Sequence, residues 1–217
     1  MKTLKNEWLV WIVMSIPFLL LFFLWNQIPD NIPTHYGFDG KPDRWNNKST
    51  LLWFIPVLTF FIYALFWAIP KIDPKLQKES MGNKYNHIKL IVMILISSIS
   101  SLFIYSSANQ GIAVFSLLTS IICAFIMLLG NYLPTVKPNY FIGIRTPWTL
   151  SNEDNWLKTH RVGGRIYLIG GFVCLILNLV FPKMSVVFLI TLIGILILPV
   201  FYSFYVYVTR SKQVSNP

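Results

Sequence analysis

The sequence predicts an all-α, polytopic membrane protein with six transmembrane helices. Of its 217 residues, 55% are hydrophobic and only 12% are charged, whereas a soluble domain carries about 25% charged residues. The apolar residues are also grouped into blocks that approach the roughly 20 residues needed to cross a bilayer. Finally, the basic residues are concentrated in alternate connections between these blocks, as expected for a chain that crosses a membrane repeatedly.

Six apolar blocks qualify as spanning helices, because they lack the strict alternation of membrane β-barrel strands. The blocks are Trp8–Ile28, Leu51–Ile69, Leu90–Ser107, Ile112–Leu133, Ile166–Phe181 and Val186–Val208. The fifth block is short, so we expect its helix to begin further upstream. The first block is too long for the core of a signal peptide, and no small-residue cleavage site follows it.

Basic residues predict the orientation of the chain. They gather in the second connection (Lys71, Lys75, Lys78, Lys84, Lys89), in the fourth (Lys137, Arg145, Lys158, Arg161, Arg165) and after the last block (Arg210, Lys212). Basic loops stay in the cytoplasm, so we expect both termini and these two connections on the cytoplasmic side of the membrane. This topology and contact with anionic membrane lipid explain the net charge of +10. No groove-reading motif suggests direct binding of nucleic acid.

The central regions of the six blocks contain no Asp, Glu, Lys, Arg or His. This pattern argues against an ion-coupled transporter and against an intramembrane protease with paired aspartates or a zinc-binding HExxH motif. Small polar residues instead share helix faces, as in the stripe formed by Ser116, Thr119, Ser120 and Cys123. We expect such faces to pack against neighbouring helices, and we expect Asn178 to form a hydrogen bond between helices. No catalytic residues are predicted.

The outer loop, residues 29–50, is punctuated by prolines and glycines, which favour turns over a helix. His35, Asp39 and Asp43 follow one another at intervals of four residues. Imidazole and carboxylate groups suit a divalent metal ion, so a metal site is one interpretation of this spacing. A solvated, hydrogen-bonded turn is the simpler interpretation, because the loop has no cysteine and no established ligand spacing.

The inner loop, residues 134–165, is too long to be a simple connection, which indicates a structure and a role of its own. Ser151 is the expected N-cap of a helix from Asn152 to Val162 that lies along the inner membrane interface. This helix is predicted to run into the fifth spanning helix at Gly163-Gly164. Trp156, Thr159 and His160 fall near one face of it, and Arg145 offers a donor fork to a lipid phosphate or an acidic partner.

Two motifs in these loops resemble a known family. The inner-loop motif comprises Gly130-Asn131-Tyr132, Pro134-Thr135, Lys137-Pro138-Asn139, the run Gly143–Leu150, Trp156, Thr159-His160-Arg161 and Gly163-Gly164. The outer-loop motif comprises Ile32–His35, Gly40, Pro42-Asp43 and Lys48. Together they are similar to the bacterial SdpI family and to the uncharacterised N-terminal domain that often precedes it.

The resemblance implies a multi-pass immunity protein that protects a bacterium against a secreted antimicrobial peptide toxin. It also implies a receptor role in signal transduction, in which the toxin-bound protein holds a cytoplasmic transcriptional repressor at the membrane. A metal-dependent enzyme or a lipid-handling protein that uses either loop is the alternative. The residues that we expect to bind a partner or ligand are Asn131, Asn139, Arg145, Thr146, Pro147, Trp148, Trp156, His160 and Arg161. We expect a two-helix unit over residues 1–70 and a four-helix unit over residues 71–217.

Overall fold

The computed structural model describes residues 7–37, 41–73, 83–109 and 112–215, with side chains to Arg210 in the last helix. Six helices are long and apolar enough to cross a membrane, as the sequence predicted. They are α1 (Glu7–Leu24), α2 (Thr50–Ile72), α4 (Asn83–Ala108), α5 (Val114–Tyr132), α7 (Glu153–Val180) and α8 (Ser185–Ser215). The smaller elements are the strands β1 (Asn31–Tyr36) and β2 (Pro42–Asn47), the helix α6 (Pro147–Ser151) and the 3-10 turns η2 (Leu133–Thr135) and η3 (Pro182–Met184).

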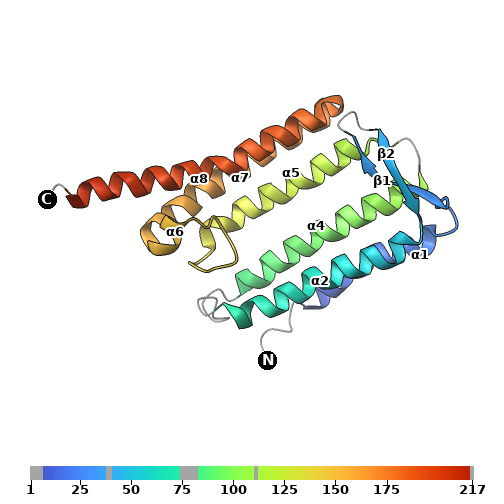
Figure 1. The fold of residues 1–217 in the computed structure, drawn as a ribbon, viewed down its shortest axis with the longest axis horizontal. Helices are drawn as coiled ribbons and strands as arrows, with labels where there is room; N and C mark the ends of the chain where they lie inside the picture. Colours follow the sequence, from blue (N-terminus) through green and yellow to red (C-terminus); the bar gives the residue numbers. More distant parts are fainter. Residues whose placement is uncertain (1–6, 38–40, 74–82, 110–111, 216–217) are drawn as a thin grey trace.

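The helices lie roughly alongside one another (Figure 1). Helix α4 packs against α1 and α2 on one side and against α5 on the other, and α7 lies between α5 and α8. The β1–β2 hairpin lies at one end of the bundle, while α6 lies at the opposite end (Figure 1). We call these the hairpin end and the basic end. The basic end comprises the first residues of α1, α4 and α7, the last residues of α2, α5 and α8, and the loop 134–165.

The outer loop forms a β-hairpin. The sequence predicted only turns in this loop, within an all-α fold. β1 pairs with β2 in an antiparallel register that aligns Asn31 with Asn47 and Pro33 with Trp45. Every residue of β2 is exposed, so the strand lacks the apolar alternation that identifies a half-buried strand in a sequence. Ile32 in β1 is fully buried in a cluster with residues of α1, α2 and α4 and thereby fixes the hairpin to the bundle.

The helix expected from Asn152 to Val162 is the first part of α7, which continues to Val180 without a break. The N-cap prediction was wrong by one residue: the side chain of Asn152, not Ser151, accepts a hydrogen bond from the backbone N–H of Asn155 at 2.9 Å. Gly163-Gly164 does not end the helix. A Cβ atom on Gly164 would lie 2.7 Å from the carbonyl oxygen of Gly130, so this glycine allows α7 to approach α5 closely.

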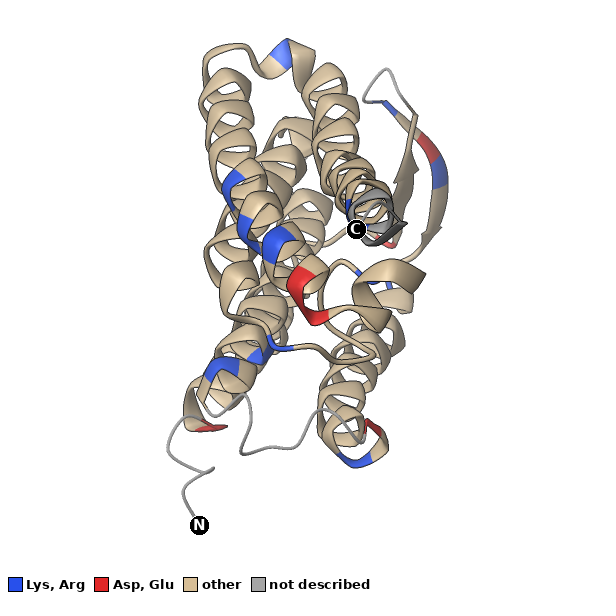
Figure 2. Cartoon of the chain, turned by 90° about the vertical axis from the view of Figure 1, so that its left-hand side faces the viewer, with Lys and Arg blue, Asp and Glu red and all other residues tan. Residues whose placement is uncertain are grey.

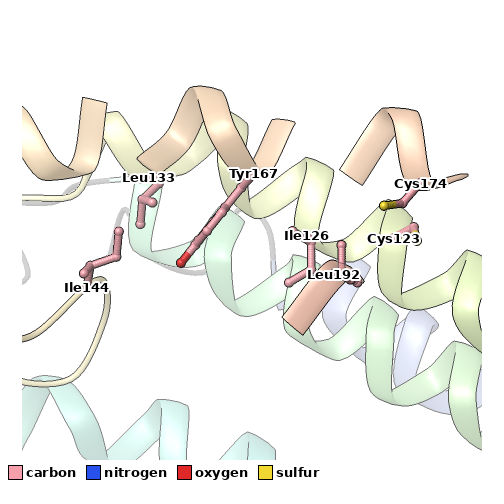
Figure 3. Close-up of a cluster of buried hydrophobic side chains, with 7 residues drawn as sticks. All are labelled: Cys123, Ile126, Leu133, Ile144, Tyr167, Cys174 and Leu192. Carbon is pink, nitrogen blue, oxygen red and sulfur yellow. The ribbon is translucent and has the colours of Figure 1, made fainter. Parts of the chain in front are cut away.

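A hydrophobic cluster joins α5, α7 and α8 to the loop at the basic end (Figure 3). It consists of Cys123, Ile126, Leu133, Ile144, Tyr167, Cys174 and Leu192. Both cysteines are buried and free, as expected for thiols that serve in packing. Ile144 comes from the loop and belongs to this cluster, so the position of the loop is coupled to the packing of the helices.

Hydrogen bonds between helices confirm the expected role of the small polar residues. The side-chain amide of Asn178 donates to the carbonyl oxygen of Ser116 at 2.9 Å and to the hydroxyl of Ser120 at 2.8 Å. The hydroxyl of Ser97 in α4 donates to the carbonyl oxygen of Val13 in α1 at 2.8 Å. These bonds hold neighbouring helices together where apolar contact alone gives little preference over lipid.

Candidate functional site

The loop 134–165 covers the basic end and is surrounded by positive charge. Viewed from this end, basic segments lie on several helix ends and acidic segments are fewer (Figure 2). The basic residues described here are Lys71, Lys84, Lys89, Lys137, Arg145, Lys158, Arg161, Arg165 and Arg210, and the acidic ones are Glu7, Asp73, Glu153 and Asp154. The loop therefore presents a cationic surface on the side that the charge pattern predicts to be cytoplasmic.

Asn139 organises the first half of the loop. Its carbonyl oxygen accepts hydrogen bonds from the backbone N–H groups of Phe141 and Ile142 at 2.9 and 2.6 Å. Its amide nitrogen donates to the backbone oxygens of Lys137 and Ile142 at 2.8 and 2.9 Å. The side chain is almost fully buried, so these bonds replace water around its polar atoms and fix the turn.

Asp73, which follows α2, joins this turn to a distant part of the chain. Its carboxylate accepts a hydrogen bond from the backbone N–H of Tyr140 at 2.8 Å. Asp73 is only 3% exposed although it lies between basic residues in the sequence. The bond ties the end of α2 to the loop between α5 and α7.

His160 and Trp156 form the buried centre of the loop. Their rings stack with centroids 4.0 Å apart, and both residues are almost completely inaccessible to solvent. The backbone N–H of Ile144 donates to Nε2 of His160 at 3.1 Å, while Nδ1 of His160 lies 2.8 Å from the carbonyl oxygen of Trp156. Because Nε2 accepts, the proton belongs on Nδ1 and the imidazole is neutral. Nε1 of Trp156 donates to the carbonyl oxygen of Val136 at 2.8 Å.

Gly143 permits the loop to pass over this ring. Its φ of +116° is strained for a residue with a side chain. A Cβ atom at this position would also overlap Nε2 of His160. The glycine therefore allows both the backbone conformation and the bond from Ile144 to the imidazole.

Thr146 begins the short helix α6 with a reciprocal cap. Its hydroxyl accepts from the backbone N–H of Thr149 at 3.3 Å, and the hydroxyl of Thr149 accepts from the backbone N–H of Thr146 at 2.9 Å. Pro147 occupies the first turn, where its missing N–H costs nothing. The cap holds Trp148 in a fixed position facing α8.

The loop is attached to α8 at Ser203. Nε1 of Trp148 donates to the hydroxyl of Ser203 at 2.7 Å, and the amide of Asn155 donates to the Ser203 carbonyl oxygen at 3.1 Å. The Trp148 ring also contacts the rings of Phe204 and Tyr207, with centroids 5.3 and 5.9 Å away. Two elements of the loop thus bind the same turn of α8.

The residues expected to bind a partner fall into two groups. Asn139, Thr146, Trp148, Trp156 and His160 are brought together as the internal framework of the loop, in which their polar atoms bond to protein groups.

The second group consists of Asn131, Arg145, Pro147 and Arg161, which are exposed. Arg145 also donates to the carbonyl oxygen of Tyr140 at 2.5 Å, so it stabilises the loop while its charge remains exposed on the surface. The exposed residues are the ones that can meet a partner.

Sequence reasoning assigned no site role to four residues of this framework: Asp73, Gly143, Asn155 and Ser203, although Gly143 belongs to the inner-loop motif. Ser203 was detectable in principle, because it is a polar residue within an otherwise apolar block. Asp73 lies among the lysines of the second connection, where its charge alone does not indicate a structural role. Its contact with Tyr140 joins residues 67 positions apart, a separation across which sequence spacing gives no information.

At the hairpin end, His35 and Asp43 approach one another across the two strands. Nδ1 of His35 lies 2.6 Å from Oδ1 of Asp43, and both side chains are more than half exposed. Asp39, the third residue of the predicted metal set, lies outside the described residues. Within the described ranges, no group of three or more His, Cys, Asp or Glu residues has a geometry that would hold a metal ion.

A cavity of about 260 Å³ lies beneath β1. Thr34, His35 and Tyr36 form its hairpin side, and apolar residues of α4 and of the first part of α5, including Phe103 and Phe115, form the other. The cavity is therefore lined mainly by apolar side chains and adjoins the polar hairpin.

Comparisons with known proteins agree with the two motifs. Residues 135–203 match the SdpI/YfhL protein family, and residues 12–60 match a domain of unknown function, DUF1648. The chain is 23% identical over 182 residues to "Immunity protein SdpI" of Bacillus subtilis (strain 168), an alignment that covers 84% of this chain and 86% of the relative. No solved structure matches the chain. The chain is therefore similar to the immunity protein SdpI over most of its length, with a region that matches the SdpI/YfhL family after a region that matches DUF1648.

Proposed function

We propose that this protein is an immunity protein of the bacterial cytoplasmic membrane that protects the cell against a secreted antimicrobial peptide. The observation that carries the proposal is the alignment with the immunity protein SdpI, which covers 84% of this chain. The two family matches, over residues 12–60 and 135–203, include the hairpin and nearly all of the loop at the basic end. The six apolar helices and the opposed hairpin and basic ends support a role that faces both sides of a membrane.

In this proposal, the hairpin end faces outward and meets the peptide. The cavity beneath β1 offers an apolar recess next to the polar hairpin, a combination that suits an amphipathic peptide. The basic end faces the cytoplasm, in keeping with the preference of lysine and arginine for that side. Reporter fusions test this orientation: reporters placed in the hairpin and in α6 should report opposite sides, and identical reports would overturn it.

A killing assay tests the protective function. Two strains of a sensitive bacterial host are compared, one carrying this gene and one carrying an empty vector. Both are exposed to the purified peptide toxin against which the immunity protein SdpI of Bacillus subtilis protects. Expression is expected to raise survival at least tenfold. The control is Gly143→Val, which disrupts the loop framework and should abolish protection, with membrane levels compared by immunoblot. Equal killing with and without a well-expressed protein would contradict protection against that peptide.

We further propose that the basic end holds a cytoplasmic transcriptional repressor when toxin is bound. Coupling between the two ends requires two arrangements of the bundle, each favoured by one partner. The cationic surface around Arg145 supports this role, because an acidic segment of a partner is attracted to it. Arg145→Gln should leave toxin binding intact and abolish co-purification of the repressor. Arg145→Lys keeps the positive charge but loses the forked hydrogen-bond donor of the guanidinium. It therefore separates the contribution of charge to repressor binding from that of the forked hydrogen bonds.

The second candidate function is a metal-dependent enzyme at the hairpin end, and the approach of His35 to Asp43 within 2.6 Å favours it. An imidazole and a carboxylate are suitable ligands for zinc. Elemental analysis of the purified protein decides between the two functions. Stoichiometric zinc that is lost in His35→Ala would favour the enzyme, while sub-stoichiometric metal in both proteins would exclude this site.

A further inference from the structure

A second cavity lies at the basic end, and none of its lining residues belongs to the loop 134–165. It has a volume of about 220 Å³ and lies between the last turns of α2 and the first turns of α4, next to the start of α1. Its polar lining consists of Lys71, Lys89, Glu7 and Asn86, and its aromatic lining includes Trp67 and Tyr85. Neither the immunity function nor the repressor contact uses this cavity.

Of the two lysines that line the cavity, Lys89 has a carboxylate partner, and Lys71 has none among the described residues. Lys89 is only 7% exposed and forms an ion pair with Glu7, whose second carboxylate oxygen accepts from the hydroxyl of Tyr63 at 3.3 Å. The hydroxyl of Tyr85 donates to the carbonyl oxygen of Phe66. Lys71 has no carboxylate partner among the described residues, and its Nζ lies 3.0 Å from the centre of the Trp67 ring. The cavity therefore carries a net positive charge and has a cation available for an anion.

The position of this cavity at the ends of two spanning helices places it at the level of the lipid headgroups. Lys71 is the last residue but one of α2, and Glu7 is the first described residue of α1. Because both helices cross the membrane, these residues lie at the level of the lipid headgroups. Trp67 is 63% exposed, as expected for an aromatic residue at the interface between membrane and water. An anion that enters here is surrounded by apolar helix surfaces on the membrane side.

We propose that this cavity binds the phosphate headgroup of an anionic phospholipid. Lys71 and the side-chain amide of Asn86 supply donors to the phosphate oxygens, while Lys89 contributes positive charge held in place by Glu7. The acyl chains extend along the exposed apolar surface of α2. Basic pockets between transmembrane helices on the cytoplasmic side are suited to such headgroups. A bound lipid would connect α2 to α4 at the basic end.

Native mass spectrometry and thermal unfolding of the full chain in detergent test this proposal. The probes are phosphatidylglycerol, phosphatidylcholine and inorganic phosphate, each added to delipidated protein. Phosphatidylglycerol is expected to remain bound and to raise the unfolding temperature, whereas phosphatidylcholine should do neither. One lysine near the membrane surface contributes about 1 kcal/mol to the binding of anionic lipid. Lys71→Gln should therefore weaken binding of phosphatidylglycerol about fivefold. Lys71→Arg should restore it.

Lys84→Gln is the matched control, because Lys84 is an exposed lysine at the start of α4 that does not line the cavity. If Lys84→Gln and Lys71→Gln weakened phosphatidylglycerol binding equally, the binding would depend only on the general surface charge, and the proposal would be overturned. Equal binding of phosphatidylcholine would also overturn it. Stabilisation by inorganic phosphate at the same concentration as phosphatidylglycerol would overturn the assignment to a lipid. Lys71 is exposed, so a folded Lys71→Gln protein is expected, and its elution volume in size-exclusion chromatography checks this.

Discussion

Trp156 provides the most direct test of the proposed loop framework. Its side chain is inaccessible to solvent, and its indole N–H donates to the carbonyl oxygen of Val136 at 2.8 Å. Trp156→Phe removes this donor and leaves the buried carbonyl without it, which costs about 2 kcal/mol. The smaller ring also packs less well against His160, which adds roughly 1 kcal/mol.

The total of about 3 kcal/mol corresponds to a decrease in unfolding temperature of roughly 6–12 °C for a chain of this size. The assay is the fraction of protein that remains monodisperse in size-exclusion chromatography after heating in detergent, which does not depend on tryptophan fluorescence. Trp45→Phe is the control, because Trp45 lies on β2 and is 50% exposed. A surface substitution of this kind should shift the temperature by less than about 2 °C. The framework would be refuted if both variants unfolded at the same temperature.

Three further predictions use the same assay. Gly143→Ala should destabilise the protein by about 2 kcal/mol or more, because the residue has a φ of +116° and faces His160; Gly194→Ala in α8, where the space is open, should be neutral or stabilising by roughly 0.5–1 kcal/mol. Trp148→Phe and Ser203→Ala should be non-additive by about 0.5–1.5 kcal/mol in a double-mutant cycle, and an additive double mutant would contradict the bond between them. Tyr167→Phe removes a hydrogen bond of 2.9 Å to the Leu196 carbonyl oxygen and should lower stability by about 0.6 kcal/mol; a loss above about 2 kcal/mol would indicate a further role for the hydroxyl.

The spanning helices were predictable because the bilayer imposes a simple requirement on each segment separately. Every predicted block overlaps a helix in the structure. The shared face of Trp156, Thr159 and His160 was also predictable, since residues three and four positions apart adjoin one another on a helix. These features depend only on local periodicity and composition.

Features that depend on distant contacts were not predictable in this way. The close approach of α7 to α5 and α8 depends on Gly163-Gly164, which face Gly130 of α5 and Pro199 of α8. The hairpin is held by the burial of Ile32 among three helices, and Trp148 bonds to a residue 55 positions away. The division of the chain at residue 70 stays a prediction.

The attachment at Ser203 has a mechanical consequence. Since α6 and α7 are both hydrogen-bonded to Ser203 of α8, we expect the ends of these three helices to move together. Helix α8 has 31 residues and is roughly 46 Å long, so a tilt at its start near η3 would displace its other end, less any bending at Pro199. The contact between α4 and α5 is less extensive than that between α5 and α7, so we expect relative movement within the bundle to occur there. Cross-linking α4 to α5 should then block coupling between the hairpin end and the basic end.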